Sequence, residues 1–535
     1  MDVKYIFVTG GVVSSLGKGL TAASIALLLE KRGLKVAMLK LDPYLNVDPG
    51  TMNPFQHGEV YVTDDGAETD LDLGHYFRFT EAPLSRASNT TSGQIYEEVI
   101  RRERVGDYLG KTVQVIPHVT DEIKKRILQA SRTQDETDVV MVEIGGTVGD
   151  IESLPFLEAI RQFRYERADH CLNIHLTYVP YLKAAGEVKT KPTQHSVQVL
   201  REIGLIPDLL LCRCENPLSE EIKDKISLFC SVPKEAVMDE VDVDFSIYEV
   251  PLFLRDQGLD DKICKRLNLP NLKADLSEWE RLLYKMRHPK GKVVIGIVGK
   301  YLQHQDAYKS VFEALHHAAI SHGVSLEVRT FESDKVTGFE NIQGCDGYLV
   351  PGGFGSRGWI GKLLTAQYCR EKQIPYFGLC LGMQVMCVEF ARDVLHLQGA
   401  SSTEMDPETP YPVISLLSEQ QKTPYLGGTM RLGAYPCLLK EGSLSHKAYG
   451  QLRISERHRH RYEFNSQFKE AFEKQGLIQT GTLEGHPLCE IMEIRNHPWM
   501  VGVQYHPEFQ SRPVKPHPLF TDFIQASLNH ALGRN

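Results

Sequence analysis

Hydrophobic residues in the first half of the chain gather in short continuous runs, which alternate with longer helical patterns. A strand that is apolar on both faces must be covered on both sides, which is typical of parallel sheets flanked by helices. The runs at residues 5–8, 36–41 and 139–142 therefore predict strands, and residues 20–32, closed by Gly33, predict a helix. We expect ligands to bind at the carboxyl ends of these strands, where the loops open.

The alternating pattern weakens near the middle of the chain and then starts again. Residues 268–292 carry Asn, Pro and charged side chains in place of regular hydrophobic positions. Apolar runs at residues 293–299, 347–351 and 376–378 then indicate a second α/β unit that begins with a strand. A chain of 535 residues is also too long for a single hydrophobic core. The predicted organisation is one α/β domain at residues 1–267, a linker at residues 268–292 and a second α/β domain at residues 293–535.

Composition narrows the class of function. With 42% hydrophobic and 24% charged residues, the chain has the balance of a soluble globular protein, and its net charge of −9 argues against general binding to nucleic acid or membrane surfaces. No run approaches the roughly 20 apolar residues of a membrane span. The eleven cysteines form no paired CxxC framework, and the first residues do not resemble a signal peptide. We therefore expect a cytoplasmic protein with reduced thiols and small-molecule ligands.

A candidate nucleophile follows an apolar run in the second domain. Cys380 lies in the sequence Gly-Leu-Cys-Leu-Gly at residues 378–382, between a predicted strand and a predicted helix. Such a turn can project a side chain above the sheet, and the helix N-terminus favours a thiolate. His506 and Glu508 follow a later strand, where they suit a base and the group that orients it. Taken alone, such a cysteine is more often a buried apolar residue, and such a histidine is more often structural.

The combination of these two motifs resembles the class I glutamine amidotransferase family. The resemblance implies that the cysteine attacks the side-chain amide of glutamine, forms a glutamyl thioester and releases ammonia. It also implies that the loop at residues 351–355 forms an oxyanion hole, although a simple turn has the same spacing. The glutamine-binding residues that it implies are Gly353, Leu381, Gly382, Met383, Gln384, Glu404 and Arg461.

A glycine-rich turn joins the first strand to the first helix. Residues 9–21 can wrap phosphate oxygens with successive backbone N–H groups, and Lys18 adds a positive charge. The turn departs from the standard P-loop, because five residues separate Gly11 from Gly17 and Gly19 takes the place of Ser or Thr. A generic glycine turn is the alternative. Asp72 and Glu143 offer carboxylates of the kind that bind Mg²⁺.

Four long segments in the first half, taken in order, resemble the CTP synthase family. They are residues 10–19, 40–52, 142–153 and 186–194, and the resemblance covers nearly the whole chain. It implies an N-terminal P-loop-like synthetase domain with a parallel sheet and a C-terminal class I glutamine amidotransferase domain. The γ-phosphoryl group of ATP would pass to O4 of UTP, and ammonia would then displace phosphate to give CTP. Catalysis of the first step would depend on positioning and on charge neutralisation.

Residue roles follow from the same resemblance. The implied ATP-binding residues are Ser15, Leu16, Gly17, Lys18, Gly19, Leu20, Asp72, Asp242 and Val243, with Asp72 and Glu143 as ligands of Mg²⁺. The implied UTP- and CTP-binding residues are Ser14, Asp150, Ile151, Glu152, Lys189, Thr190, Lys191, Pro192, Thr193, Gln194 and Lys225. Without the resemblance, the two lysines at 189 and 191 would be taken for solvated surface charges.

Regulation and assembly are further expectations from the family. Its members are inhibited by their product CTP, activated by GTP and assembled as homotetramers through the N-terminal domain. Pro54, His57 and Val60 would line an ammonia channel, although His57 suits a packed loop equally well. The stretch 418–425 is shorter than in relatives, which puts GTP contacts in doubt. Two alternatives are another ATP-dependent amidotransferase, such as a cobyrinic-acid amidase, and a nucleotide-switch or scaffold protein with an idle Cys380 site.

Overall fold

The computed structural model describes residues 2–50, 52–53, 57–132, 136–300, 302, 304–416 and 430–534. The chain divides into two compact units, which we describe separately. Unit 1 comprises Met1–Thr51 and Asp72–Glu280, and unit 2 comprises Met52–Leu71 and Arg281–Asn535. A short N-terminal segment therefore belongs to the same unit as the C-terminal half of the chain, which no pattern in the sequence indicates.

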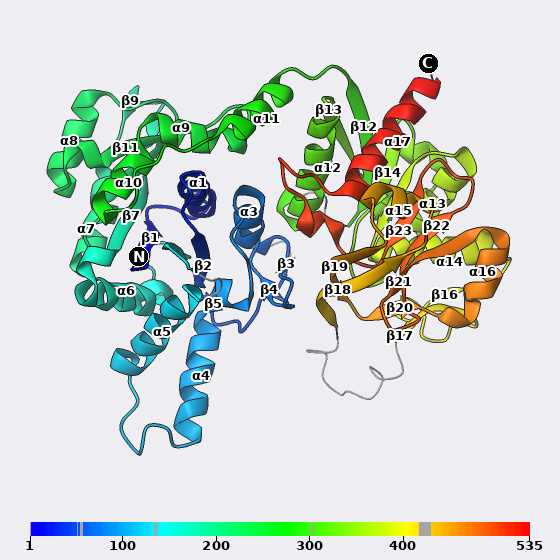
Figure 1. Cartoon of the computed structure of the whole chain (residues 1–535), viewed down its shortest axis with the longest axis horizontal. Coiled ribbons are helices and arrows are strands. Elements are labelled where there is room, and N and C mark those ends of the chain that lie inside the picture. The colour runs from blue at the N-terminus through cyan, green and yellow to red at the C-terminus, as the bar shows by residue number, and fades with distance from the viewer. Residues whose placement is uncertain are drawn as a thin grey trace. The chain divides into compact units, whose positions relative to one another are not determined.

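Unit 1 is built on a sheet that, within the described residues, has seven strands, all parallel (Figure 1). Its spatial order is β11-β10-β7-β1-β6-β2-β5. The strands predicted near residues 5, 36 and 139 are confirmed in its centre. The strand bounds are β1 (Lys4–Gly10), β2 (Val36–Asp42), β5 (Asn89–Thr91), β6 (Val139–Ile144), β7 (Cys171–Tyr178), β10 (Leu209–Cys214) and β11 (Val237–Val241).

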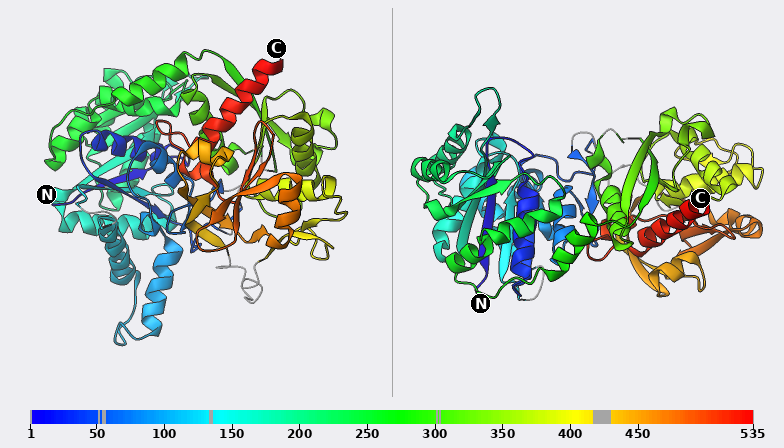
Figure 2. Two further views of the ribbon diagram at one scale, coloured as in Figure 1. Left: turned by 45° about the vertical axis from the view of Figure 1, so that its right-hand side comes forward. Right: turned by 90° about the horizontal axis from the view of Figure 1, so that it is seen from above.

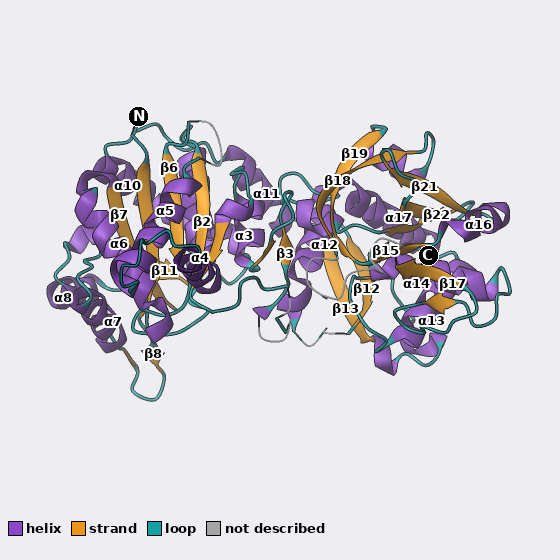
Figure 3. Ribbon diagram, turned by 90° about the horizontal axis from the view of Figure 1, so that it is seen from below, coloured by secondary structure: helices purple, strands orange, loops and turns teal. Residues whose placement is uncertain are grey.

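Helices cover both faces of this sheet, and its central strands are therefore buried on both sides (Figure 3). One face packs against α4 (Ser92–Arg104), α5 (Thr120–Ala130) and α6 (Leu154–Glu166) through a continuous apolar core. Helix α1 (Lys18–Glu30) lies on the other face and is buried almost all round, since α3 (Asp72–Phe79) and α9 (Val250–Asp256) pack over it. Other helices of unit 1 are α7 (Lys191–Glu202), α8 (Glu220–Cys230) and α10 (Leu259–Leu267), and the boundary after Glu280 falls within α11 (Ser277–Arg287).

Unit 2 has a mixed sheet, for which the described residues give nine strands in the order β13-β12-β14-β15-β23-β22-β21-β18-β19 (Figure 2). The first five are parallel and the last four continue antiparallel. The runs predicted near residues 293, 347 and 376 are confirmed as β12, β14 and β15. The strand bounds are β12 (Lys292–Gly299), β13 (Ser325–Glu332), β14 (Gly347–Val350), β15 (Tyr376–Leu379), β18 (Arg431–Leu439), β19 (Arg453–His460), β21 (Leu477–Leu483), β22 (Cys489–Ile494) and β23 (Met500–Val503).

Two apolar cores lie on opposite faces of this mixed sheet. One core includes α12 (Lys309–Ser321) and α17 (Pro518–Arg534), and the other includes α13 (Trp359–Lys372) and α14 (Leu381–Asp393). The smaller elements of unit 2 are β16 (Ser401–Ser402), β17 (Pro412–Leu416), β20 (Tyr462–Phe464), α15 (Leu444–Tyr449) and α16 (Lys469–Gln475). Among the described helices of the whole chain, none has the length and hydrophobicity needed to cross a membrane.

The segment at residues 52–71 is held in unit 2 by a buried arginine of β19. This segment forms the hairpin β3 (Tyr61–Val62) and β4 (Glu68–Thr69). The guanidinium of Arg457 donates to Asp64 at 2.5 Å and to the hydroxyl of Tyr61 at 2.6 Å. The Tyr61 hydroxyl in turn donates to the carbonyl of Phe509 at 2.9 Å. Hydrogen bonds, two of them charge-assisted, thus fix the hairpin to Arg457 of β19 and to Phe509 after β23.

Candidate functional site

Cys380 lies on the turn between β15 and α14, as the sequence predicts. Its backbone has φ 50° and ψ −101°, a conformation that side chains rarely adopt. The turn requires glycine at residue 382, because a Cβ there would lie only 2.1 Å from the carbonyl oxygen of Val350. Packing at this glycine therefore brings the turn close to β14 and places the strained Cys380 at the start of the helix.

His506 and Glu508 follow β23 in the same unit. Nδ1 of His506 lies 2.8 Å from Oε1 of Glu508, and both side chains are largely buried. Burial alone would lower the pKa of His506, but Glu508 and Cys380 outweigh it and raise that pKa to about 10. The arrangement favours an imidazolium between a carboxylate and the sulfur, which is the charge distribution that a cysteine nucleophile needs.

The glycine loop at residues 351–355 lies against this pair. A Cβ on Gly352 would come within 2.8 Å of His506 Cε1 and 3.5 Å of Cys380 Cβ, so no larger residue fits there. The ammonium of Lys300, which the sequence did not single out, donates to the carbonyls of Phe354 and Gly355 at 2.5 Å and 2.6 Å. The loop can thus bring backbone N–H groups close to the sulfur, as an oxyanion hole requires.

The residues predicted to bind glutamine gather around this centre. Leu381, Gly382, Met383 and Gln384 form the first turn of α14. Oε1 of Glu404 accepts a hydrogen bond from Gly355 N–H at 2.6 Å, and a Cβ on Gly353 would lie 3.7 Å from Leu381. Arg461 lies in the short connection between β19 and β20. All seven predicted residues therefore belong to unit 2.

The glycine-rich turn of unit 1 has the backbone of a phosphate cradle. Val12, Ser15 and Gly17 have positive φ angles, and Gly17 is the N-cap of α1. Alternating backbone conformations of this kind point successive N–H groups toward one centre. Nζ of Lys18 donates to the carbonyl of Gly146 at 2.8 Å, and burial lowers the pKa of this lysine. A bound polyanion would be a stronger partner for the Lys18 ammonium than the neutral carbonyl of Gly146.

Two carboxylates explain why Gly19 replaces the usual Ser or Thr. A Cβ on Gly19 would lie 2.3 Å from Oδ1 of Asp72 and 3.3 Å from Oε2 of Glu143. Nζ of Lys40 lies between them, bonded to Asp72 and, at 2.7 Å, to Oε1 of Glu143. Burial lowers the pKa of Lys40, but the two carboxylates outweigh it and raise that pKa well above its usual value. Within the described residues no cluster of three or more His, Cys, Asp or Glu side chains forms a metal site.

The residues predicted for the uridine nucleotide lie in unit 1 but remain more dispersed. Asp150 accepts a hydrogen bond from Thr147 N–H at 3.0 Å, next to the exposed Ile151 and Glu152. Gln194 donates to Thr190 at 3.0 Å in the first turn of α7. The other predicted side chains in this group are the exposed Ser14, the ion-paired Lys189, Lys191 over the ring of Phe229, the buried Thr193, Pro192 at the start of α7, and Lys225 on α8.

No sequence pattern indicates a group of side chains that lies beside the predicted ATP residues Asp242 and Val243. Nε of Arg213 donates to Asp242 at 2.5 Å, and a Cβ on Gly17 would lie 3.1 Å from its Nη1. The carboxylate of Glu240, at the end of β11, accepts from the hydroxyl of Thr21 at 2.7 Å. Its second oxygen is buried and has no hydrogen-bond partner among the described residues. Leu16 and Leu20, also predicted for ATP, flank the start of α1.

We predict that Glu240 makes folding dependent on pH. Burial raises the pKa of its carboxyl from 4.5 to about 7. The folded state binds this proton more tightly than the unfolded chain, so the stabilisation is present at low pH and is lost as the pH rises through 7. The loss amounts to about 3 kcal/mol of unfolding free energy. Urea unfolding at acidic and alkaline pH should show it in the natural protein and not in Glu240→Gln. An equal pH dependence in both would contradict the prediction.

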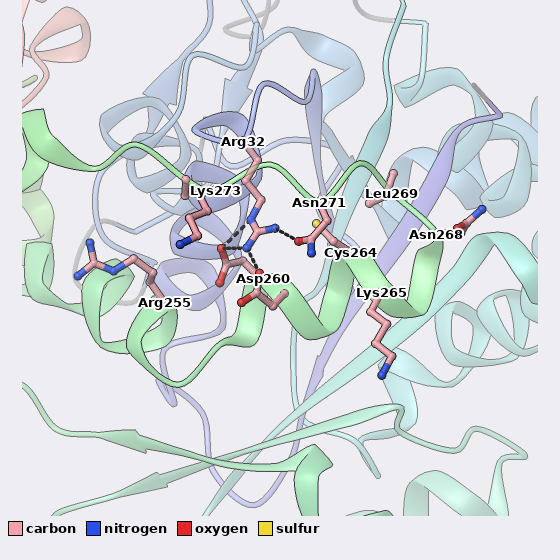
Figure 4. Close-up of a pocket in the computed structure, with 11 residues that line it drawn as sticks. Arg32, Arg255, Asp260, Cys264, Lys265, Asn268, Leu269, Asn271 and Lys273 are labelled. Atoms are coloured by element: carbon pink, nitrogen blue, oxygen red, sulfur yellow. Dashed lines mark hydrogen bonds and ion pairs between the residues drawn. The ribbon is translucent and has the colours of Figure 1, made fainter.

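A separate pocket of about 700 Å³ lies in unit 1 at the carboxyl end of α1 (Figure 4). The buried Arg32 extends into its wall, where Nε donates to Asp260 at 2.7 Å and Nη1 donates to Asn271 at 2.9 Å. None of the residues that line this pocket belongs to the predicted sites. These contacts attach the end of α1 to α10 and to the stretch after it, which gives Arg32 a structural role.

Comparison with known proteins matches each half of the chain to a protein family. A model of the CTP synthase N-terminus matches residues 4–269, and one of class I glutamine amidotransferases matches residues 303–526. The CTP synthase of Protochlamydia amoebophila (strain UWE25) is 68% identical over 99% of this chain and 98% of its own. The chain belongs to the CTP synthase family. Membership in the CTP synthase family makes it an enzyme, a glutamine-hydrolysing ligase.

The chain is also similar to other proteins. The CTP synthase of Chlamydia abortus (strain DSM 27085 / S26/3) is 63% identical over 99% of both chains. A glutaminase domain of Trypanosoma brucei CTPS with bound acivicin is 35% identical, covering 44% of this chain and 94% of that one, with a TM-score of 0.42. Two expectations for the CTP synthase fold lie outside the described residues, namely Pro54 and the short stretch 418–425. His57 and Val60 lie in the described part of unit 2.

Proposed function

We propose that the chain aminates UTP to CTP with ammonia from glutamine, and that ATP first phosphorylates O4 of UTP. The observation that carries this proposal is the presence, on one chain, of the Cys380, His506 and Glu508 arrangement and of a phosphate cradle with adjoining carboxylates. A uracil carbonyl is a poor electrophile, so its amination needs an activated leaving group. A chain with one unit that activates the carbonyl with ATP and another that releases ammonia from glutamine would meet that requirement.

In unit 2, glutamine hydrolysis starts from the ion pair in which the thiol proton of Cys380 has passed to Nε2 of His506. The raised pKa of His506, about 10, favours this pair, and Glu508 stabilises the imidazolium. The sulfur then attacks the amide carbon of glutamine, and the loop at residues 351–355 stabilises the oxyanion. His506 returns the proton to the leaving nitrogen, which departs as ammonia, and water hydrolyses the thioester.

In unit 1, the turn at residues 10–19 holds the phosphates of ATP, and Lys18 neutralises their charge. Asp72 and Glu143 fit Mg²⁺, because both carboxylates converge at Gly19, where the missing side chain leaves room beside the phosphates. When bound there, Mg²⁺ would neutralise phosphate charge. Lys40 keeps the two carboxylates close together by pairing with both. The segment at residues 189–194, with Ser14 and Lys225, holds UTP.

Regulation and assembly form part of the same proposal. CTP binds as an inhibitory product near Asp150, Ile151 and Glu152, and GTP acts as an allosteric activator. The protein forms a homotetramer through its N-terminal domain, and ammonia passes between the two active sites by an internal channel to which His57 and Val60 contribute. The enzyme works in the cytoplasm, in keeping with eleven free cysteines and no disulfide among the described residues.

The direct test is a product assay with the purified full-length chain. Incubation with ATP, Mg²⁺, UTP and either glutamine or ammonium salt should convert the uracil chromophore into a cytosine chromophore, at one CTP per ATP consumed. Omitting ATP should stop the reaction with both nitrogen sources. The absence of any spectral change with ammonium salt would reject UTP as the acceptor, and a product other than CTP would favour a different ATP-dependent amidotransferase.

A further inference from the structure

A buried amide lies beside the sulfur of Cys380, and none of the steps above uses it. Gln504 follows β23 directly, and its residue is 0% exposed. Its Nε2 donates a hydrogen bond to Sγ of Cys380 at 3.7 Å. The backbone N–H of Cys380 also donates to the carbonyl of Val503 at 2.7 Å. The amide and the nucleophile are therefore held in register by neighbouring strands of one sheet.

The orientation of this amide follows from its second contact. Nε2 of Gln384 donates to Oε1 of Gln504 at 3.3 Å and to the carbonyl of Tyr462 at 3.1 Å. If the amide of Gln504 were flipped, its NH₂ group would face the NH₂ group of Gln384, and its oxygen would face the sulfur. The network therefore fixes the N–H donor toward Cys380.

The sulfur of Cys380 forms its favourable hydrogen bond with a different group in each of its two protonation states. As a thiol it donates weakly to the carbonyl of Arg459 at 3.9 Å. As a thiolate it repels that carbonyl but accepts a hydrogen bond from Gln504. In a buried site, a hydrogen bond to an ion is roughly twice as strong as one between neutral groups. The contact with Gln504 thus favours the charged form of the sulfur selectively.

We propose that Gln504 is a catalytic residue that stabilises the thiolate of Cys380 through its side-chain N–H. When the S–H bond breaks, the proton passes to Nε2 of His506, and the negative charge remains on sulfur facing the amide. When sulfur attacks the amide carbon of glutamine, its electron pair forms the C–S bond and the hydrogen bond from Gln504 weakens. This assignment rests on the proposed glutaminase role of Cys380.

The test compares the reactivity of Cys380 in the full-length chain and in two variants. Gln504→Leu keeps the approximate volume but removes the donor, and Gln504→Glu keeps the shape but places a carboxylate beside the sulfur. Alkylation of Cys380 by iodoacetamide is followed across the neutral and alkaline range by mass spectrometry of the modified peptide. We expect the midpoint of this pH profile to rise by about one pH unit in Gln504→Leu, which corresponds to a tenfold change, and by more in Gln504→Glu.

Both variants should lose about tenfold or more of glutamine-dependent synthesis while keeping synthesis from ammonium salt, which reports on the fold. An unchanged midpoint in both variants would overturn the proposal, as would loss of the ammonium-dependent reaction in both, since the amide would then serve the fold. The proposed function is tested separately by the natural sequence. The natural protein could consume no glutamine and still show an alkylation midpoint at lower pH than both variants. In that case the glutaminase proposal fails and the thiolate contact remains supported.

Discussion

Replacing Cys380 with alanine is expected to abolish CTP formation from glutamine and to leave CTP formation from ammonium salt unchanged. The substitution removes the only sulfur that the described structure places beside His506 and the glycine loop. Without a nucleophile no thioester can form, and removal of a covalent catalyst of this kind costs a factor of about 10³ or more. Ammonia supplied in solution enters the second reaction directly, so the chemistry of unit 1 does not depend on this cysteine.

The measurement is CTP production with each nitrogen source, followed on the same preparation. Cys387→Ala is a matched control, because Cys387 is a buried thiol on α14, the helix that Cys380 precedes, and burial raises its pKa. This control should retain glutamine-dependent synthesis. Loss of both reactions in Cys380→Ala, with retention in the control, would assign Cys380 a structural role and would contradict the proposed mechanism.

Introducing a methyl group at Gly19 is expected to stop CTP formation from both nitrogen sources. A Cβ there would lie 2.3 Å from Oδ1 of Asp72, a distance that no relaxed structure shows. Asp72 cannot withdraw freely, because it is paired with the buried Lys40. The conflict would displace either the carboxylate or the phosphate cradle. Displacing groups that neutralise charge in phosphoryl transfer costs about 10² to 10³ in rate.

Gly291→Ala provides the control for Gly19→Ala. The nearest atom to a Cβ on Gly291 is 3.5 Å away, which is an ordinary van der Waals contact. Ammonium-dependent synthesis should therefore persist in Gly291→Ala and disappear in Gly19→Ala. Glutamine hydrolysis, measured as glutamate release, should survive in both, since the glutaminase residues belong to unit 2. Full ammonium-dependent activity in Gly19→Ala would show that Asp72 does not belong to the proposed ATP site.

Sequence patterns predicted the parts of the fold that depend on local hydrophobic order. Apolar runs predicted β1, β2, β6, β12, β14 and β15, because buried strands leave a continuous signature. The motifs around Cys380 and His506 were also visible, since each follows such a strand. Their proximity in space was an expectation from family resemblance, because it depends on the pairing of β15 with β23.

Other features depend on contacts between residues far apart in sequence, and no local pattern signals them. Lys300 reaches the glycine loop across 54 residues, and Glu240 meets Thr21 across 219 residues. Each looks like an ordinary strand-end charge when read alone. Gln504 is equally inconspicuous, since only the fold brings its amide beside sulfur. The departure at Gly19 was visible in the sequence, but its cause required the position of Asp72.

The hairpin at residues 52–71 restricts how the two catalytic halves can be separated. A fragment that begins at residue 281 would lack Tyr61 and Asp64, so the guanidinium of Arg457 would lose its hydrogen bonds to both. A fragment that ends at residue 280 would carry the hairpin without the surface that receives it. An isolated glutaminase should therefore be made by supplying residues 52–71 as well, either as a fused segment or as a second polypeptide.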